Sequence, residues 1–160
     1  MGASGSGKTT LLNILSCLDK PTTGEVALLG KRVDKLSFNQ LRVMRSRNIG
    51  LIFQQFHLIS YLDVLHNIML AQSYHSVTDR DAALDILAKL DLLDKASYLP
   101  SQLSGGQQQR ACIARALINE PDLIFADEPT GNLDAANETK VMALLQKLHQ
   151  DGKTVVMVTH

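Results

Sequence analysis

Cysteine and uncompensated charge are both scarce in this sequence of 160 residues. Cys17 and Cys112 are its only cysteines, and they lack C-x-x-C spacing, which favours reduced core thiols over a disulfide or a metal site. Sixteen basic residues balance sixteen acidic ones, so no net field attracts nucleic acid or an anionic membrane surface. No apolar run approaches the roughly 20 residues that a membrane-spanning helix needs. Any role at a membrane would therefore come through a partner.

The hydrophobic content of 45% is enough for a real core, and the length fits one domain or part of one. There are no internal repeats and no low-complexity segments. Apolar runs of strand length at 49–53, 123–126 and 153–159 alternate with helical patterns, which predicts an α/β fold with a mainly parallel sheet. We expect helices over residues 9–18, 39–47, 105–119 and 136–151, a short strand over 25–29, and a mainly helical insertion from about 62 to 100, with Ser37 and Thr78 as helix caps.

Residues 2–9 read Gly-Ala-Ser-Gly-Ser-Gly-Lys-Thr, a complete G-x-x-x-x-G-K-[ST] phosphate-binding loop. Glycines let backbone N–H groups converge on phosphate oxygens, and the helix that follows would point its positive N-terminal end at the same anion. Lys8 adds a cation for the β- and γ-phosphates, and the hydroxyl of Thr9 can bind the Mg²⁺ that bridges them. The sequence therefore predicts a nucleotide-phosphate site here rather than a flexible glycine-serine linker.

A second pattern places two carboxylates at the end of a buried strand. The apolar run 123–126 ends in Asp127 and Glu128, and parallel strands end at the sheet edge where phosphate loops also lie. Asp127 suits the outer coordination shell of Mg²⁺, and Glu128 lies where it can polarise a water that attacks the γ-phosphate. Alone, such a pair is typical of a solvated loop. Together with the loop at 2–9, it indicates nucleotide hydrolysis.

A second glycine-rich segment opens the helix expected at 105–119. Leu103-Ser104-Gly105-Gly106-Gln107 supplies a capping hydroxyl and exposed backbone N–H groups, so it predicts another anion site at a helix N-terminus. One nucleotide does not need two such sites in one subunit. The pattern therefore suggests a composite site shared between two subunits.

With these motifs in this order, the chain resembles the nucleotide-binding domain of ATP-binding cassette (ABC) transporters over essentially its whole length. Gly2–Thr9 is similar to Walker A, Leu103–Gln107 matches the LSGGQ signature, and Leu123–Glu128 is similar to Walker B with its following glutamate. Gln54 is similar to the Q-loop glutamine, Gly131–Asp134 to the D-loop, and His160 to the switch histidine. The stretches 2–8, 13–19 and 126–134 also resemble the macrolide-exporter and lipoprotein-releasing subgroup.

The resemblance implies a role for each motif residue. The phosphates of ATP would be held by Ser4, Gly5, Ser6, Gly7, Lys8, Thr9 and Thr10, and Mg²⁺ by Thr9, Gln54 and Asp127. Glu128 would be the general base, with His160 and Gln54 completing the catalytic set. Ser104, Gly105, Gly106 and Gln107 would close over ATP bound by the opposite subunit, and Asp134 would link the two sites. No N-K-x-D guanine motif occurs, and the family's adenine-stacking aromatic lies upstream of residue 1, so the choice of ATP rests on the resemblance.

The fold that the resemblance implies is a P-loop NTPase core with a helical subdomain, the ABC ATPase fold, truncated at both ends. We expect residues 1–55 and 104–160 to form the catalytic core of a partial nucleotide-binding domain, and about 56–103 the helical subdomain. The implied function is an ATPase subunit of an exporter, in which ATP closes a dimer and hydrolysis to ADP and phosphate reopens it. Its partners would be a second such domain in a homodimer and a transmembrane permease, which would hold it at the cytoplasmic face of the inner membrane.

Two other functions stay open at this point. A soluble ABC ATPase acting on ribosomes or DNA is disfavoured by the neutral charge and by the short stretch between Gln54 and Leu103, which has no zinc-type cysteine pairs. A regulatory module that only binds nucleotide would need a defect among the hydrolysis residues, and all four are present: Lys8, Asp127, Glu128 and His160. The phosphate loop begins at residue 2 without the strand that normally precedes it, so we expect an internal fragment of a longer protein rather than a compact complete one.

Overall fold

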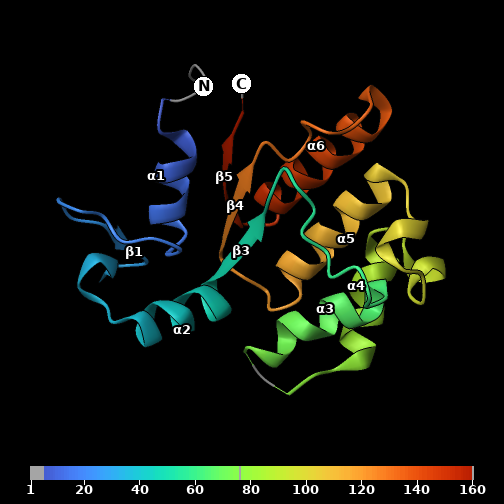
Figure 1. The fold of residues 1–160 in the computed structure, drawn as a ribbon, viewed down its shortest axis with the longest axis horizontal. Helices are drawn as coiled ribbons and strands as arrows, with labels where there is room; N and C mark the ends of the chain where they lie inside the picture. The colour runs from blue at the N-terminus through green and yellow to red at the C-terminus, as the bar shows by residue number, and fades with distance from the viewer. Residues whose placement is uncertain (1–5, 76, 160) are drawn as a thin grey trace.

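The structure, a computed structural model, describes residues 6–75 and 77–159. Within these ranges α-helices surround a parallel sheet, with a small hairpin to one side (Figure 1). The α-helices are α1 (Lys8–Leu15), α2 (Phe38–Asn48), α3 (Val64–Ser73), α4 (Arg80–Lys89), α5 (Gly105–Leu117) and α6 (Ala135–Gln150). Short 3₁₀ helices are η1 (Val33–Lys35), η2 (Leu93–Lys95) and η3 (Pro100–Gln102).

The parallel sheet orders its strands β3-β4-β5, with β3 at Ile49–Ile52, β4 at Leu123–Asp127 and β5 at Thr154–Val158. Ile52 lies opposite Ala126, and Asp127 lies opposite Val158. Because the strands run in the same direction, their carboxyl ends meet at one edge of the sheet, the upper edge in Figure 1. The separate antiparallel hairpin joins β1 (Ala27–Leu28) to β2 (Lys31–Arg32).

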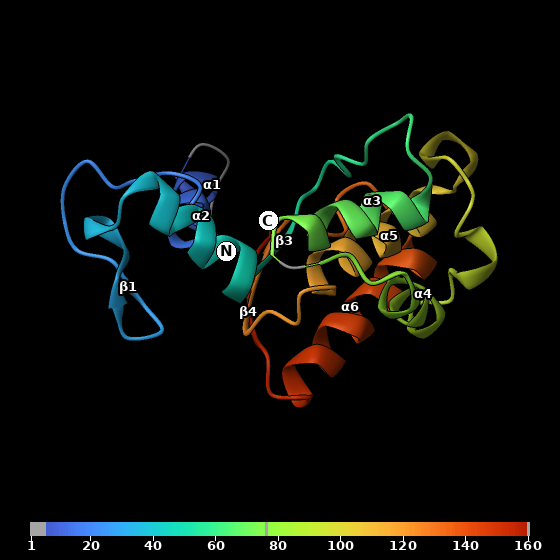
Figure 2. The same cartoon turned by 90° about the horizontal axis from the view of Figure 1, so that it is seen from below.

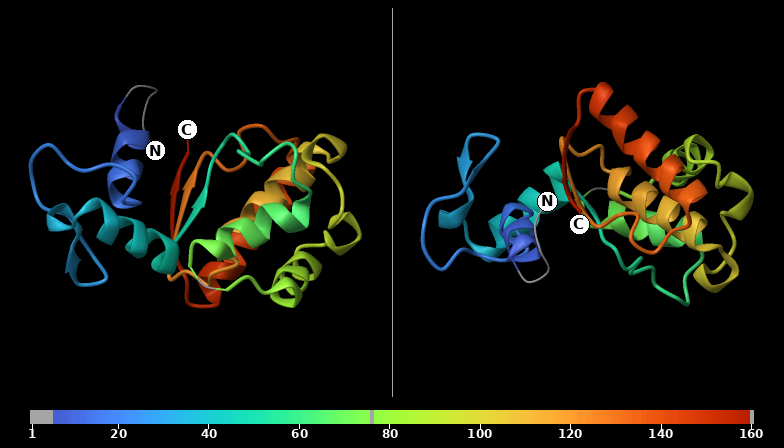
Figure 3. Two further views of the ribbon diagram at one scale, coloured as in Figure 1. Left: turned by 60° about the horizontal axis from the view of Figure 1, so that its bottom comes forward. Right: turned by 90° about the horizontal axis from the view of Figure 1, so that it is seen from above.

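Each face of the sheet is covered by helices, which is why the strands read as unbroken apolar runs. Along β4, Leu123 and Phe125 pack into a core with α1 and α2, whereas Ile124 and Ala126 pack into a larger core formed mainly by α3 to α6. Figures 2 and 3 show α1 and α2 on one side of the sheet and α3 to α6 on the other. The predicted α/β class with a parallel sheet is confirmed.

Of the helix caps predicted at Ser37 and Thr78, the first is confirmed and the second is wrong by one residue. Ser37 caps α2 as expected, in a reciprocal capping box with Gln40. The cap of α4 is Asp79, not Thr78, because the Asp79 carboxylate accepts hydrogen bonds from the backbone N–H groups of Asp81 and Ala82 at 2.9 and 3.0 Å. The Asp79 carboxylate therefore satisfies two of the unpaired N–H groups that begin the helix.

The short strand expected at 25–29 is instead a two-residue strand, and it pairs with β2, which the sequence did not predict. Leu29 and Gly30 turn the chain with φ angles of 49° and 73°. Arg32 then donates to the carboxylate of Asp34 at 2.8 and 2.6 Å. The hairpin is stabilised by the geometry of its turn and by this ion pair. It has no alternating apolar pattern that would have predicted it.

None of the helices in the described part of the chain combines the length and the hydropathy that a membrane crossing requires.

Candidate functional site

The phosphate-binding segment opens α1. Gly7 is the N-cap residue and has a φ of 83°, a left-handed conformation that glycine adopts without a side-chain penalty. The carbonyl oxygen of Gly7 accepts from Leu11 N–H at 2.9 Å, which leaves the first-turn N–H groups directed outward at the positive end of the helix. Lys8 Nζ lies 3.4 Å from Ser6 Oγ, and Thr9 and Thr10 are exposed. Ser4 and Gly5 lie outside the described residues.

The sheet fixes where this helix points. Leu12 on α1 is 1% exposed and belongs to the same core as Leu123 and Phe125 of β4. α1 therefore lies along β4 and β5, with its N-terminus at the carboxyl edge of the sheet (Figure 1). The segment that binds phosphate by sequence is thus brought to the edge where β4 ends.

The two carboxylates lie on either side of a sharp turn at that edge. Asp127 is the last residue of β4, and Glu128 has a φ of 44°, in the left-handed region that non-glycine residues rarely adopt. Glu128 N–H donates to the carbonyl of Val158 at 2.9 Å, and the carbonyl of Glu128 accepts from Gly131 N–H at 3.1 Å. Backbone strain of this kind persists where surrounding bonds hold it, and it is concentrated at functional sites.

Gln54 joins the same region from the end of β3. The amide of Asn132 donates to the backbone carbonyl of Gln54 at 2.9 Å. Gly131 leaves room for the Gln54 side chain, because a Cβ at Gly131 would lie 2.9 Å from Gln54 Nε2. The segment that follows β3 is therefore bonded to the segment that follows β4.

Side chains of α5 hold the next residues of the segment after β3. The carbonyl of Phe56 accepts from Cys112 Sγ at 2.8 Å and from Arg115 Nη2 at 3.0 Å, and Arg115 also donates to the carbonyl of His57. Burial raises the pKa of Cys112 to about 12, so this thiol stays protonated and donates. Both cysteines are buried and unbridged, as their spacing indicated.

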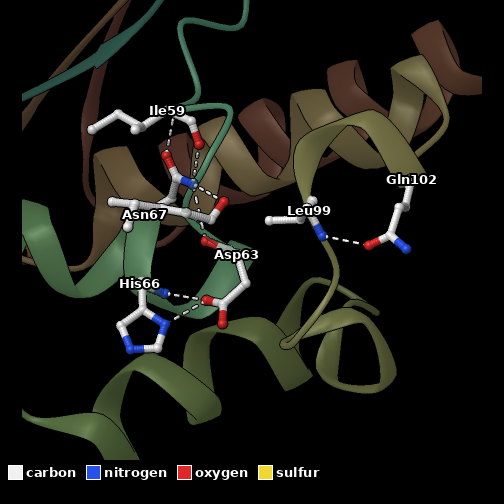
Figure 4. Close-up of polar contacts among 7 residues, drawn as sticks. Ile59, Asp63, His66, Asn67, Leu99 and Gln102 are labelled. Carbon is white, nitrogen blue, oxygen red and sulfur yellow. Dashed lines mark hydrogen bonds and ion pairs between the residues drawn. The ribbon is translucent and has the colours of Figure 1, made fainter.

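Asn67 on α3 fixes the far end of this segment (Figure 4). Its side chain is buried, and its Oδ1 accepts from Ile59 N–H at 2.7 Å. Its Nδ2 lies within 3.1 Å of the carbonyls of Ile59, Leu62 and Asp63. Asp63 in turn caps α3, accepting from His66 N–H at 2.8 Å. The chain from 54 to 63 is therefore held at several points.

The second glycine-rich segment lies against the start of α6. Ser104 caps α5, and Ser104 and Gln107 form a reciprocal capping box, with bonds of 3.3 and 2.9 Å. A Cβ at Gly105 would be 3.8 Å from the carbonyl oxygen of Asn132, and a Cβ at Gly106 only 2.1 Å from Asn137 Oδ1. Because α6 approaches this closely, position 106 requires a glycine.

Asp134 caps α6 beside these glycines. Its carboxylate accepts from the backbone N–H and the side-chain amide of Asn137, both at 2.8 Å. These two bonds hold the pKa of Asp134 below its usual range, so the carboxylate is charged at neutral pH. Ser104, Gly106 and Asp134 thus belong to one contact region between α5 and α6.

The predicted residues therefore fall into two groups in the structure. The first group lies at the carboxyl edge of the sheet and consists of Ser6, Gly7, Lys8, Thr9, Thr10, Gln54, Asp127 and Glu128. The second group lies where α5 meets α6 and consists of Ser104, Gly105, Gly106, Gln107 and Asp134. His160 falls outside the described residues. Within 6–75 and 77–159 no three His, Cys, Asp or Glu side chains cluster as metal ligands. The set of a hydroxyl, an amide and one carboxylate from Thr9, Gln54 and Asp127 fits Mg²⁺, which binds few protein oxygens and keeps several waters.

Sequence reasoning missed several residues that support these groups. Asn67 and Asn137 hold neighbouring segments in place and belong to no motif, although an asparagine within the apolar face of α3 is a signal. Asn132 lies inside the segment that resembles the D-loop, but its bond to Gln54 was not predicted. Gln109 on α5 was also missed. It is fully buried, and among the described residues neither its Nε2 nor its Oε1 has a hydrogen-bond partner.

Three kinds of comparison agree on the chain's relatives. The family profile described as ABC transporter matches residues 1–131. The whole chain is 50% identical over 163 residues to a macrolide export ATP-binding/permease protein MacB of Hahella chejuensis, and 49% identical over 162 residues to one of Chlorobaculum tepidum. In each case the chain spans 25% of that protein's length.

Solved structures agree as well. The ATP-binding cassette MJ0796, in a dimeric post-hydrolysis state bound to ADP and Pi, superposes with a TM-score of 0.91 at 48% identity, covering all of this chain and 72% of that one. A second dimeric structure of MJ0796, described as a bacterial ABC transporter cassette, gives a TM-score of 0.90 at the same identity and coverage. The motifs, the fold and these likenesses lead to one conclusion: the chain belongs to the ABC transporter family and has the fold of its ATPase cassettes.

Proposed function

We propose that this chain binds ATP with Mg²⁺, hydrolyses it to ADP and phosphate, and drives an export permease through closure of a dimer. The observation that carries the proposal is that α1 packs along β4 and β5 with its N-terminus at the edge of the sheet where β4 ends in Asp127 and Glu128 follows (Figure 1). In this proposal the edge would supply a phosphate-binding helix N-terminus, a metal-binding carboxylate and a base. The relatives named for macrolide export support transport as the purpose of the hydrolysis.

In the proposed reaction, Lys8 and the N–H groups around Gly7 hold the β- and γ-phosphates. Thr9, Gln54 and Asp127 would hold Mg²⁺, which when bound neutralises phosphate charge in the transition state. Glu128 orients a water and accepts its proton as the water attacks the γ-phosphate. Glu128 has a left-handed φ of 44°, and its N–H donates to the carbonyl of Val158, which fixes the backbone from which the proposed base projects. His160 and Gln54 would complete the contacts to the γ-phosphate.

A second subunit completes the proposed site. Gly105 and Gly106 lie close to Asn132 and Asn137. Together with Ser104 and Gln107 they form the N-terminus of α5, which would face an anion of another molecule. We therefore assign them to ATP held by the opposite copy, with Asp134 at the junction. The MJ0796 structures, which are described as dimeric, support this arrangement.

The permease partner would dock in a groove of about 490 Å³ beside the segment after β3. Apolar side chains of Phe53, Leu70 and Tyr74 line this groove together with the cations Arg42 and Arg45. Its lining also includes His57 and Ile59, so a helix seated there would contact the chain that leads back to Gln54. Residues 56–103 would act as the helical subdomain that carries the permease, on the cytoplasmic side of the inner membrane.

The test replaces the proposed base in the full-length protein. Glu128→Gln keeps the size of the side chain but removes the base, so turnover should fall by about 10²–10⁴ while ATP still binds. Loss of a negative charge beside the γ-phosphate should also favour an ATP-dependent dimer, which light scattering would detect.

Adding Ser104→Arg to this variant should abolish the dimer and leave ATP binding by the monomer largely intact. Hydrolysis by Glu128→Gln at the wild-type rate would show that another group is the base. A dimer that persists with Ser104→Arg would show that the composite site is wrong.

A further inference from the structure

Basic side chains are concentrated in one part of the chain, although the total charge is zero. Residues 19–48 hold seven of the sixteen basic side chains and only three of the sixteen acidic ones. This segment contains the hairpin and α2, which lie together at one end of the molecule in Figures 2 and 3. α2 has no acidic residue and carries three arginines: Arg42, Arg45 and Arg47. The molecule therefore has a local positive field that its total charge does not reveal.

The acidic side chains of this segment leave its other cations uncompensated. Two of the three, Glu25 and Asp34, both pair with Arg32, at 2.7 and 2.6 Å. Within residues 6–75 and 77–159, no ion pair involves Lys31 or Arg47. These two positive charges are therefore available to an anion from outside the chain.

A groove of about 440 Å³ between the hairpin and α2 brings these two cations together. Lys31 and Arg47 both line it, and its other polar lining consists of three amide side chains, those of Asn39, Gln40 and Asn48. Its apolar lining consists of Leu36, Val43 and Met44. No carboxylate occurs among the lining residues in the described part of the chain. Cations, amide donors and apolar surface in one groove suit an anion that is attached to an apolar group.

Exposed apolar side chains accompany this groove. Phe38 is 79% exposed at the start of α2, and Leu29 is 48% exposed at the turn of the hairpin. Lys20 donates to the carbonyl of Leu36, a lining residue, and its Nζ lies 5.3 Å from the centre of the Phe38 ring. Cations interleaved with exposed apolar side chains are typical of a surface that binds an anionic bilayer. Phe38 is the only aromatic residue in 19–48, whereas a surface that stacks successive nucleic-acid bases uses several.

We propose that the groove between the hairpin and α2 binds the phosphate of an anionic phospholipid in a bilayer, with Lys31 and Arg47 as its cationic ligands. The apolar lining would contact the glycerol backbone, and Phe38 would enter the membrane interface. The inference goes beyond the function proposed above, and it departs from the expectation that a role at a membrane comes only through a partner. Other side chains of α2, Arg42 and Arg45, line the groove assigned to the permease, so one helix would serve both contacts.

The experiment measures binding of the chain to lipid vesicles by flotation, without nucleotide. The chain should float with vesicles of equal parts phosphatidylglycerol and phosphatidylcholine, and not with vesicles of phosphatidylcholine alone. Removal of one basic side chain near an anionic surface weakens binding about 5-fold, so Lys31→Ala with Arg47→Ala should weaken it about 25-fold. The matched control, Arg80→Ala with Lys89→Ala, removes the same charges from exposed positions on α4 and should bind like the wild type.

Two more variants separate the groove from a general effect on the fold. Lys31→Arg with Arg47→Lys keeps both charges and should retain binding. Phe38→Ala should weaken binding by an amount that persists at high salt, because salt screens the cations and does not screen apolar contact.

Binding of the Lys31→Ala, Arg47→Ala variant like the wild type would overturn the inference, as would equal binding to neutral vesicles. It would also be overturned if the chain bound soluble glycerol phosphate or a duplex oligonucleotide but not anionic vesicles. Because the assay contains no nucleotide, Glu128→Gln should float like the wild type. Failure of vesicle binding would therefore leave the proposed ATPase untouched, and failure of hydrolysis would leave this inference untouched.

Discussion

Replacing Gly106 with alanine tests how tightly α5 and α6 are packed at the proposed dimer surface. A Cβ at this position would lie 2.1 Å from Asn137 Oδ1, 2.3 Å from its Cγ and 2.9 Å from its Cβ. The contact reaches the base of the Asn137 side chain, so a rotation of the amide alone does not relieve it. Either Asn137 leaves its place against Asp134, or α5 moves away from α6.

The expected cost follows from two opposing effects. Overpacking of a close contact typically destabilises by about 1–3 kcal/mol, whereas alanine in place of a helical glycine stabilises by about 0.5–1 kcal/mol. Gly106→Ala should therefore lower the free energy of unfolding by about 1–2 kcal/mol. Gly105→Ala is the matched control, because its Cβ would meet nothing closer than 3.8 Å. That neighbouring substitution should be neutral or stabilising.

Equilibrium urea unfolding followed by circular dichroism measures both variants. A third measurement fixes the cause, because removing the Asn137 side chain removes the clash. In an Asn137→Gly background, which lacks the Cβ as well as the amide, Gly106→Ala should change sign and stabilise by about 0.5–1 kcal/mol. If Gly106→Ala is as stable as the wild type, or if its cost is the same in both backgrounds, the contact with Asn137 does not explain this glycine.

Two further substitutions test the phosphate loop and the core of α5. Lys8→Ala should abolish tight binding of Mg²⁺-ATP, because the loop loses its cation, and unchanged affinity by calorimetry would contradict the assignment. Gln109→Met should raise the free energy of unfolding by about 1 kcal/mol, because an apolar side chain of similar volume replaces a buried amide that has no hydrogen-bond partner among residues 6–75 and 77–159. A clear loss of stability in denaturant unfolding would instead mean that the Gln109 amide is hydrogen-bonded in the folded protein.

The parts of the fold that the sequence predicted well are those that depend on local chemistry. The strands near 49–53, 123–126 and 153–159 were predicted to within about two residues, because their apolar runs suit a sheet covered on both faces. The cap at Ser37 was also predicted, since a serine hydroxyl satisfies first-turn N–H groups locally. The reciprocal bond from Gln40 was found only in the structure. The cap of α4 was one residue off, because Thr78 and Asp79 both suit a cap and only the folded chain selects between them.

The sequence by itself determined which residues the proposed site could use: the phosphate loop at 2–9, the carboxylates at 127 and 128, and the glycines at 105 and 106 each follow from residue type and spacing. Tertiary structure alone decided how these pieces are held. Asn132 reaches Gln54 across 78 positions of sequence, Arg115 reaches Phe56 across 59, and Asn137 meets Gly106 only when α6 packs on α5. Such contacts join residues that are distant in the chain and depend on how the sheet places its loops. No periodicity or motif encodes them, because a single polar side chain acquires a partner only when packing brings one within hydrogen-bond distance.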